Sequence, residues 1–251
     1  MGCYAVTGSA SGIGAAARKL LEDRGHDVIG VDLAGQEVEA DLSKAEGRRR
    51  AVAEVERRCG ARLDGMVLAA GLGASHAAIE RIVAVNYFGC IAFLEGLRDA
   101  VAKAGGAAVA VASNTALALP DYGGPLEDVC LAGRESDALA GATQLDGPRC
   151  YVVSKRALIR FVRREAPGWI QSGARLNAIA PGPVRTPLLS RDLAHPEIGP
   201  RLEEFPIPAG EPAEPGVIAD AIGFLLDHPY CCGTVLCVDG GGDAQMRPDS
   251  F

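Results

Sequence analysis

A tyrosine and a lysine four residues apart, Tyr151 and Lys155, have the types and spacing of a proton-transfer pair. If this segment is helical, both side chains project from one face, so the ammonium lies beside the phenol and favours its phenolate. A phenol titrates near pH 10, and half-ionisation around pH 7–8 needs a shift of roughly 2–3 units, or about 3–4 kcal/mol. One desolvated cation and a further hydrogen-bond donor could supply it. The alternative without a catalytic role is a surface lysine that extends past a half-buried tyrosine.

A glycine-rich segment near the start of the chain could hold an anion. Residues 3–7 are typical of a buried strand and 12–24 of a helix, so the glycines occupy the turn between them. Gly8 permits the tight turn, Gly12 admits a pyrophosphate to the backbone N–H groups, and Gly14 allows close packing of helix on strand. The helix N-terminus, with Ser11 and Ile13, then faces the anion. The spacing G-x3-G-x-G differs from the commoner dinucleotide fingerprint, and a glycine-rich turn without a ligand is the alternative.

A carboxylate stands at the end of the second expected strand. Asp32 follows residues 27–31, about twenty residues beyond the glycines. A carboxylate there can accept hydrogen bonds from both hydroxyls of an adenosine ribose and would repel a 2′-phosphate. A helix cap or a turn aspartate is the alternative. We therefore expect NAD rather than NADP as the cofactor.

With these motifs in place, the chain resembles the short-chain dehydrogenase/reductase family from about residue 3 to residue 241, with the motifs in the family's order. The resemblance implies that Ser113 and Asn86 join Tyr151 and Lys155 as catalytic residues. Ser113 would donate a hydrogen bond to the substrate oxygen, and Asn86 would kink a central helix and hold a proton-relay water. Lys155 would also hold the nicotinamide ribose, and Tyr151 would contact the cofactor as well.

The same resemblance implies further cofactor contacts. Asp41 and Leu42 would meet the adenine ring, and Gly71 would allow the backbone to approach the adenine ribose. The segment after residue 181 would carry the nicotinamide carboxamide, through Gly182, Val184 and Thr186.

Two features depart from the usual family pattern. Leu68-Ala69-Ala70-Gly71 replaces the usual Asn-Asn-Ala-Gly, and Ser113 and Tyr151 are 38 residues apart, where about a dozen is usual. The extra segment, about residues 116–147, makes the chain most similar to the bacterial 3α-hydroxysteroid dehydrogenase/carbonyl reductase subgroup. That similarity implies a small hydrophobic alcohol or ketone substrate and a homo-oligomer, with a dimer favoured. Apolar spacing within the segment predicts two short amphipathic helices joined by Gly133, bordering the substrate cleft and ordered by a partner subunit; an exposed loop without a role is the alternative.

Strand and helix patterns alternate along the chain, which favours an α/β fold with a doubly wound parallel sheet in a single domain, residues 1–251. Expected strands lie near residues 3–7, 27–31, 64–70, 106–112, 174–179 and 234–238; expected helices lie near 12–24, 44–59, 77–103, 150–166 and 215–227. A proline-rich region, about residues 183–213, emerges where ligands bind in such folds and is a second candidate for the substrate wall.

Composition excludes several classes of function. The net charge of −7 argues against a nucleic-acid partner. No uninterrupted apolar run reaches the length of a membrane span and the first expected strand starts at once, so we expect no membrane contact and a cytoplasmic location. The eight cysteines and four histidines have no metal-ligand spacing, so no metal is expected.

Three other functions remain open at this stage. A non-catalytic NAD-binding sensor or scaffold would have no need for the serine, tyrosine and lysine set. A sugar epimerase or dehydratase also uses this Tyr-Lys pair but resembles a longer chain. An acyl-carrier-protein ketoreductase would prefer the phosphorylated cofactor and lack the extra segment.

Overall fold

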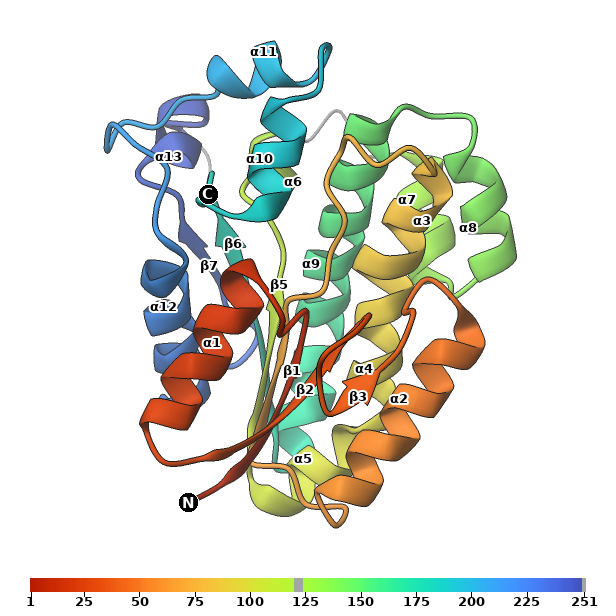
Figure 1. Ribbon diagram of the computed structural model, residues 1–251, viewed down its shortest axis with the longest axis vertical. Helices are drawn as coiled ribbons and strands as arrows, with labels where there is room; N and C mark the ends of the chain where they lie inside the picture. Colours follow the sequence, from red (N-terminus) through yellow and green to blue (C-terminus); the bar gives the residue numbers. More distant parts are fainter. Residues whose placement is uncertain (120–123, 250–251) are drawn as a thin grey trace.

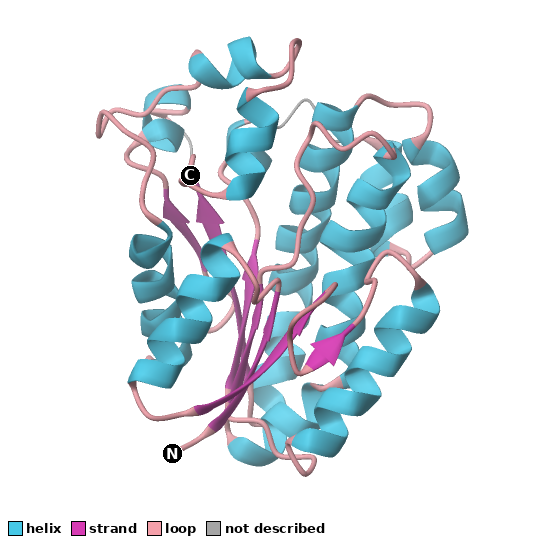
Figure 2. Ribbon diagram, in the orientation of Figure 1, coloured by secondary structure: helices cyan, strands magenta, loops and turns pink. Residues whose placement is uncertain are grey.

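A parallel β-sheet forms the centre of the molecule, and its strands alternate with helices (Figures 1 and 2). The computed structural model describes residues 1–119 and 124–249. Within them seven strands follow the order β3-β2-β1-β4-β5-β6-β7, all neighbours being parallel. Their bounds are β1 Cys3–Thr7, β2 Asp27–Asp32, β3 Val38–Glu39, β4 Gly65–Leu68, β5 Ala107–Val111, β6 Arg175–Pro181 and β7 Val235–Val238. The expected doubly wound parallel sheet is confirmed.

The central strands are apolar throughout because helices cover both faces of the sheet. Every residue of β4 and β5 is buried. One face packs against α1 and α12, and the other against α2, α4 and α9, as Figure 1 shows. These helices are α1 Gly12–Asp23, α2 Ala45–Arg58, α4 Cys90–Gly96, α9 Gly147–Gln171 and α12 Pro215–Asp227. The core therefore consists of two apolar layers, and the carboxyl ends of the strands stay free to form a site.

The helix expected over residues 77–103 is interrupted. It consists of α3 Ile79–Val83, a π-helical turn η1 Ala84–Gly89, α4, and α5 Arg98–Ala104. Asn86 lies in the π-helical turn, and its side chain bonds both backbone groups of Leu72. Irregular turns of this kind are frequent at functional sites. The resemblance implied a kink at Asn86, and the structure has a π-helical turn at this position.

The segment between Ser113 and Tyr151 contains the two predicted short helices, α7 Pro125–Leu131 and α8 Glu135–Ala142, after a short α6 Thr115–Ala118. Gly133 joins them with φ 68°. Buried side chains at Leu126, Cys130 and Ala138 pack into the same apolar cluster as α3 and α9. The helices α7 and α8 therefore pack on their own chain. Residues 120–123 of it, and residues 250–251 of the expected domain, lie outside the described residues.

The proline-rich region contains helices that the residue patterns did not predict. It forms α10 Pro187–Leu193 and α11 Gly199–Glu203, and α13 Gly242–Met246 follows β7. In Figure 1 these three helices lie beyond the carboxyl ends of the strands. The two-residue strand β3 was also missed, because a bridge this short leaves no periodic pattern.

Candidate active site

A cavity of about 780 Å³ opens at the carboxyl ends of the strands. Every predicted site residue lines it except Asn86, which lies behind the wall next to Val85. Residues from β2, β5, α9 and the segments that follow β1, β4 and β6 meet here although they are far apart in the sequence. The parallel arrangement causes this convergence, since all the strands end at one edge of the sheet.

The glycine-rich turn between β1 and α1 forms one end of the cavity. Gly8 has φ 68°, and a Cβ atom on Gly14 would lie 2.1 Å from the Gly8 carbonyl oxygen. Ser11, the residue before α1, makes no side-chain cap bond. The first backbone N–H groups of α1 are therefore left for a ligand at the mouth of the helix.

Asp32 stands beside this turn at the end of β2. Its Oδ2 accepts a hydrogen bond from the Ala10 backbone N–H at 3.0 Å, and its Oδ1 accepts one from Leu33 at 2.7 Å. These bonds fix the carboxylate at the cavity wall, where a ribose placed over the glycine turn would meet it. A negative charge in this position would repel a 2′-phosphate on that ribose.

The expected adenine end carries a cation that the sequence analysis missed. Arg81 of α3 donates to both carboxylate oxygens of Asp41, at 3.0 and 3.2 Å, and Arg81 also lines the cavity. Burial raises the pKa of Asp41, but the hydrogen bonds from Ser43 and the charges of Arg81 and Lys44 outweigh it, so the pKa is below its ordinary value. Asp41 is therefore held as a fixed anion next to Leu42.

Asn86 braces the loop that follows β4. Its Oδ1 accepts from the Leu72 N–H at 2.7 Å, and its Nδ2 donates to the Leu72 carbonyl at 3.0 Å and to Ser154 at 3.3 Å. A Cβ atom on Gly71 would lie 3.3 Å from Asn86 Oδ1 and 3.7 Å from Lys155 Nζ. Asn86 thus holds the loop at Leu72, and the backbone of Gly71 lies close to both Asn86 and Lys155.

The proton-transfer pair lies on α9, and its surroundings oppose both charged forms. Burial raises the pKa of Tyr151 to about 12, while a hydrogen bond with Ser113 lowers it and the negative charge of Asp192 raises it. Burial also lowers the pKa of Lys155 to about 8. The Lys155 ammonium donates to the Val111 carbonyl at 2.7 Å. Among the described residues, Ser113 is the group whose hydrogen bond lowers the pKa of Tyr151.

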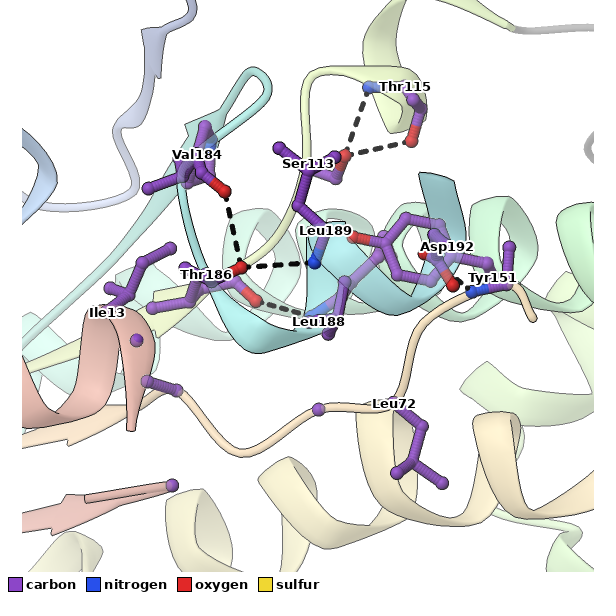
Figure 3. Close-up of a pocket in the computed structure, with 18 of the residues that line it drawn as sticks. Ile13, Leu72, Ser113, Thr115, Tyr151, Val184, Thr186, Leu188, Leu189 and Asp192 are labelled. Carbon is purple, nitrogen blue, oxygen red and sulfur yellow. Dashed lines mark hydrogen bonds between the residues drawn. The ribbon is translucent and has the colours of Figure 1, made fainter. Parts of the chain in front are cut away.

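Ser113 itself is positioned by the turn into α6. The Thr115 N–H donates to Ser113 Oγ at 3.3 Å, and the hydroxyl groups of the two residues lie 2.9 Å apart (Figure 3). The next residue, Asn114, donates to Asp239 at 3.1 Å and so ties this turn to the segment after β7. Thr115 has no local sequence signal that sets it apart from an ordinary loop threonine, which explains why sequence reasoning missed it.

The segment after β6 completes the wall. The Gly182 N–H donates to the Val238 carbonyl at 3.1 Å, which fixes the turn. Thr186 caps α10: its hydroxyl oxygen accepts from the Leu189 N–H at 3.2 Å and its O–H donates to the Val184 carbonyl at 3.2 Å (Figure 3). A Cβ atom on Gly12 would lie 3.0 Å from Thr186 Cγ2, so the turn after β1 and the start of α10 nearly touch.

Together these residues fit a dinucleotide. The bare glycine turn and helix N-terminus suit a pyrophosphate, Asp32 suits a ribose diol, and Lys155 with Tyr151 and Ser113 lies at the other end of the same cavity.

No group of three His, Cys, Asp or Glu side chains with metal-binding geometry occurs in residues 1–119 or 124–249. In the same ranges no helix is long and apolar enough to cross a membrane.

Comparison with known proteins identifies the family. A family profile described as "short chain dehydrogenase" matches residues 3–122, and one described as "Enoyl-(Acyl carrier protein) reductase" matches residues 137–243. The 3-alpha-hydroxysteroid dehydrogenase/carbonyl reductase of Comamonas testosteroni is 41% identical over 100% of both chains. The galactitol 2-dehydrogenase (L-tagatose-forming) of Cereibacter sphaeroides is 30% identical, over 95% of this chain and 94% of that protein.

A solved structure agrees with this result. The crystal structure of the 3-alpha-hydroxysteroid dehydrogenase from Pseudomonas sp. B-0831, complexed with NADH, has a TM-score of 0.96 and 44% sequence identity, and the match covers 99% of this chain and 100% of that one. Sequence motifs, sheet topology and full-length similarity coincide. The chain therefore belongs to the short-chain dehydrogenase/reductase family of oxidoreductases.

Proposed function

We propose that this protein is an NAD(H)-dependent oxidoreductase that interconverts a secondary alcohol and a ketone or aldehyde. The observation that carries the proposal is the single cavity that joins Asp32 and the glycine turn to Ser113, Tyr151 and Lys155. A bound nicotinamide would accept or supply the hydride. Everything else in the reaction is then left to the chain: to align the reacting carbon, to move one proton and to keep water out.

Tyr151 is the proposed proton acceptor during oxidation and the proton donor during reduction. Ser113 donates a hydrogen bond to the substrate oxygen, where negative charge develops. Lys155 holds the nicotinamide ribose and favours the Tyr151 phenolate once cofactor and substrate are in place. Asn86 keeps the Leu72 backbone fixed and orders a water for proton exchange with solvent.

The proposed substrate is a bulky apolar alcohol or ketone of the hydroxysteroid class. Apolar side chains from three segments surround the cavity beyond Tyr151: Leu119, Val152, Leu189, Ile198, Leu202 and Phe205. The names of the relatives from Comamonas testosteroni and Pseudomonas point to the same class. Burial of a steroid skeleton against such a wall contributes about 25 cal/mol per Å² of apolar surface.

The test is a screen of the purified protein with NAD and NADP against alcohols and ketones. The set includes 3α-hydroxysteroids and their 3β epimers, bile-acid-like steroids, quinones, small sugars and β-ketoacyl thioesters. We expect turnover of the 3α-hydroxysteroid and of bulky ketones with NAD(H). Efficient turnover of the thioester with NADPH alone would instead identify an acyl-carrier-protein ketoreductase, and dinucleotide binding without turnover would identify a sensor.

A homodimer and a cytoplasmic location belong to the same proposal. All eight cysteines are free thiols, which suits a reducing compartment. Val217 and Phe224 of α12 are 51% and 50% exposed, and β7 is an edge strand of the sheet. Because α7 and α8 already bury their apolar faces on their own chain, α12 and β7 are the better-supported contact surface for a second copy.

Phe224→Glu tests this contact by placing a charge in the apolar surface. The expected result is a halved mass in sedimentation or light scattering, with the circular dichroism spectrum of the wild type. Glu56→Gln, an exposed charge change on α2, is the control. A dimer that persists in the Phe224 variant and dissociates when residues 118–146 are replaced by a short Gly/Ser linker would assign the contact to that segment instead.

A further inference from the structure

A carboxylate on α10 makes its hydrogen bonds to a segment more than a hundred residues away in the sequence. Asp192 is 6% exposed, and its Oδ1 accepts from the Ser75 backbone N–H at 2.9 Å. Its Oδ2 accepts from the Ala74 N–H at 3.2 Å. Within the described residues no basic side chain lies within ion-pair distance of Asp192, so these two N–H groups compensate for its burial.

The loop is shaped to receive this carboxylate. A Cβ atom on Gly73 would lie 2.5 Å from both Asp192 oxygens, which is closer than non-bonded contacts of real Cβ atoms. The absence of a side chain at Gly73 is therefore what lets α10 approach the loop. The backbone N–H groups of Ala74 and Ser75, with Gly73 beside them, thus form a binding site for the Asp192 carboxylate.

This contact connects the two walls of the active site. The loop of Ala74 and Ser75 is anchored at Leu72 by Asn86. On the other side, α10 starts at the cap residue Thr186. In Figure 3 the Asp192 carboxylate lies next to the Tyr151 ring, between the helix and the loop, and the charge of Asp192 acts on Tyr151.

We propose that Asp192 is a positioning residue that holds α10 closed over the bound dinucleotide and, in doing so, keeps a negative charge beside Tyr151. The inference rests on the proposed function for its kinetic readout only. The closure of α10 on the loop is a property of the folded chain, and it can be measured without a substrate.

The charge has a predictable effect on the reaction. A carboxylate beside a phenol opposes ionisation, so Asp192 raises the pKa of Tyr151, as burial also does. Besides Tyr151 and Asp192, the titratable or charged side chains that line the cavity are His76, Lys155, Arg191, Arg201 and Glu204, together with Asp32, Asp41 and Arg81. Replacing Asp192 with a neutral residue therefore moves the pKa of Tyr151 downward, toward the working pH of the oxidation.

The test uses Asp192→Asn, which removes the charge, and Asp192→Ala, which removes both acceptors. Asp99→Asn on α5, an exposed carboxylate that does not line the cavity, is the matched control. In hydrogen exchange the amides of Ala74 and Ser75 are expected to be protected in the wild type and the control, and to exchange faster in both Asp192 variants. NADH dissociation, followed by stopped-flow fluorescence, should be about tenfold faster in both variants.

The pH profile separates positioning from a merely structural role. In Asp192→Asn the rising limb of kcat/KM for oxidation should move to lower pH by about half a unit or more, because the neighbouring charge is gone. A variant with reduced turnover but wild-type NADH dissociation and an unmoved pH profile would overturn the inference. If both Asp192 variants fail to fold, Gly73→Ala is the alternative variant, because its added Cβ displaces the Asp192 carboxylate. NADH should then also dissociate faster from Gly73→Ala. Unchanged NADH dissociation in that variant would overturn the inference as well.

Failure of the proposed function gives a different pattern. A wild-type protein that binds no NADH and turns over no substrate would refute the proposed function, while the amide exchange of Ala74 and Ser75 would still decide whether Asp192 holds α10 closed.

Discussion

Lys155 Nζ lies 5.9 Å from the centroid of the Tyr151 ring and donates its hydrogen bond to the Val111 carbonyl oxygen. The ammonium is thus anchored to the sheet rather than bonded to the phenol. Burial acts on both groups, raising the pKa of Tyr151 to about 12 and lowering that of Lys155 to about 8. The phenolate required for oxidation therefore needs further positive charge or hydrogen bonds near Tyr151, which binding of the reactants must bring.

Removal of the phenolic hydroxyl tests the proposed base. Tyr151→Phe should lower kcat by about three orders of magnitude or more, the upper part of the range for a general acid–base group. NADH affinity, measured by fluorescence titration, should change by less than about threefold, because the ring remains in place. Tyr230→Phe, at an exposed tyrosine, is the control. Turnover close to that of the wild type in Tyr151→Phe would contradict the assignment of the base.

Replacement of Lys155 tests how far its buried charge destabilises the folded chain. In the folded chain the pKa of Lys155 is about 8, below the ordinary 10.5. Below pH 8 the charged lysine therefore destabilises the folded chain. This destabilisation is lost as the pH rises from 8 to 10.5, because the lysine becomes neutral in the folded state first. Lys155→Met should raise the free energy of unfolding of the ligand-free protein at pH 7 by about 1–2 kcal/mol, less than the full shift because Val111 loses its donor. The difference from the wild type should shrink toward pH 10.

The same variant should lose both turnover and NADH affinity, since one ammonium has both proposed roles. Lys19→Met, at an exposed lysine of α1, is the matched control for denaturant unfolding at the two pH values. A Lys155 variant that is less stable than the wild type at pH 7 would show that the bond to Val111 outweighs the desolvation of the charge.

Asp32 is expected to decide between the two dinucleotides. The wild type should use NAD with at least about a hundredfold higher kcat/KM than NADP, which corresponds to roughly 2.7 kcal/mol. Asp32→Ala should lower that preference by about tenfold or more, mainly through a weaker reaction with NAD and a relieved repulsion of the 2′-phosphate. Asp23→Ala, at the exposed end of α1, should leave it unchanged. Equal efficiency of the wild type with both cofactors would show that the Asp32 carboxylate does not meet the ribose.

Gly14 is expected to tolerate no side chain. Its Cβ would lie 2.1 Å from the Gly8 carbonyl oxygen, so Gly14→Ala must push α1 away from β1. We expect a loss of about 3 kcal/mol or more in denaturant unfolding, together with lost NADH binding. Gly216→Ala in the first turn of α12, where no atom lies within 4 Å of the added Cβ, should be neutral or slightly stabilising. Equal stability of the two variants would refute this account of the turn.

The sequence alone determined the parts of the protein that depend on local pattern. Apolar runs bounded by turns gave the six longer strands and their alternation with helices, since parallel strands covered on both faces are apolar throughout. Residue types at fixed spacings identified the glycine turn, Asp32, and the Tyr151–Lys155 pair. The two helices around Gly133 followed from apolar spacing in the same way.

The tertiary structure decided what depends on contacts between distant segments. The π-helical turn at Asn86 occurs where that side chain bonds the backbone of Leu72, 14 residues away. Arg81 reaches Asp41, and Asp192 reaches Ala74 and Ser75, only because strand ends that are far apart in the chain meet at one edge of the sheet. No local periodicity encodes such contacts. The anchoring of Lys155 on Val111 and the resulting pKa values likewise arise from burial, which is set by the packing of the whole chain.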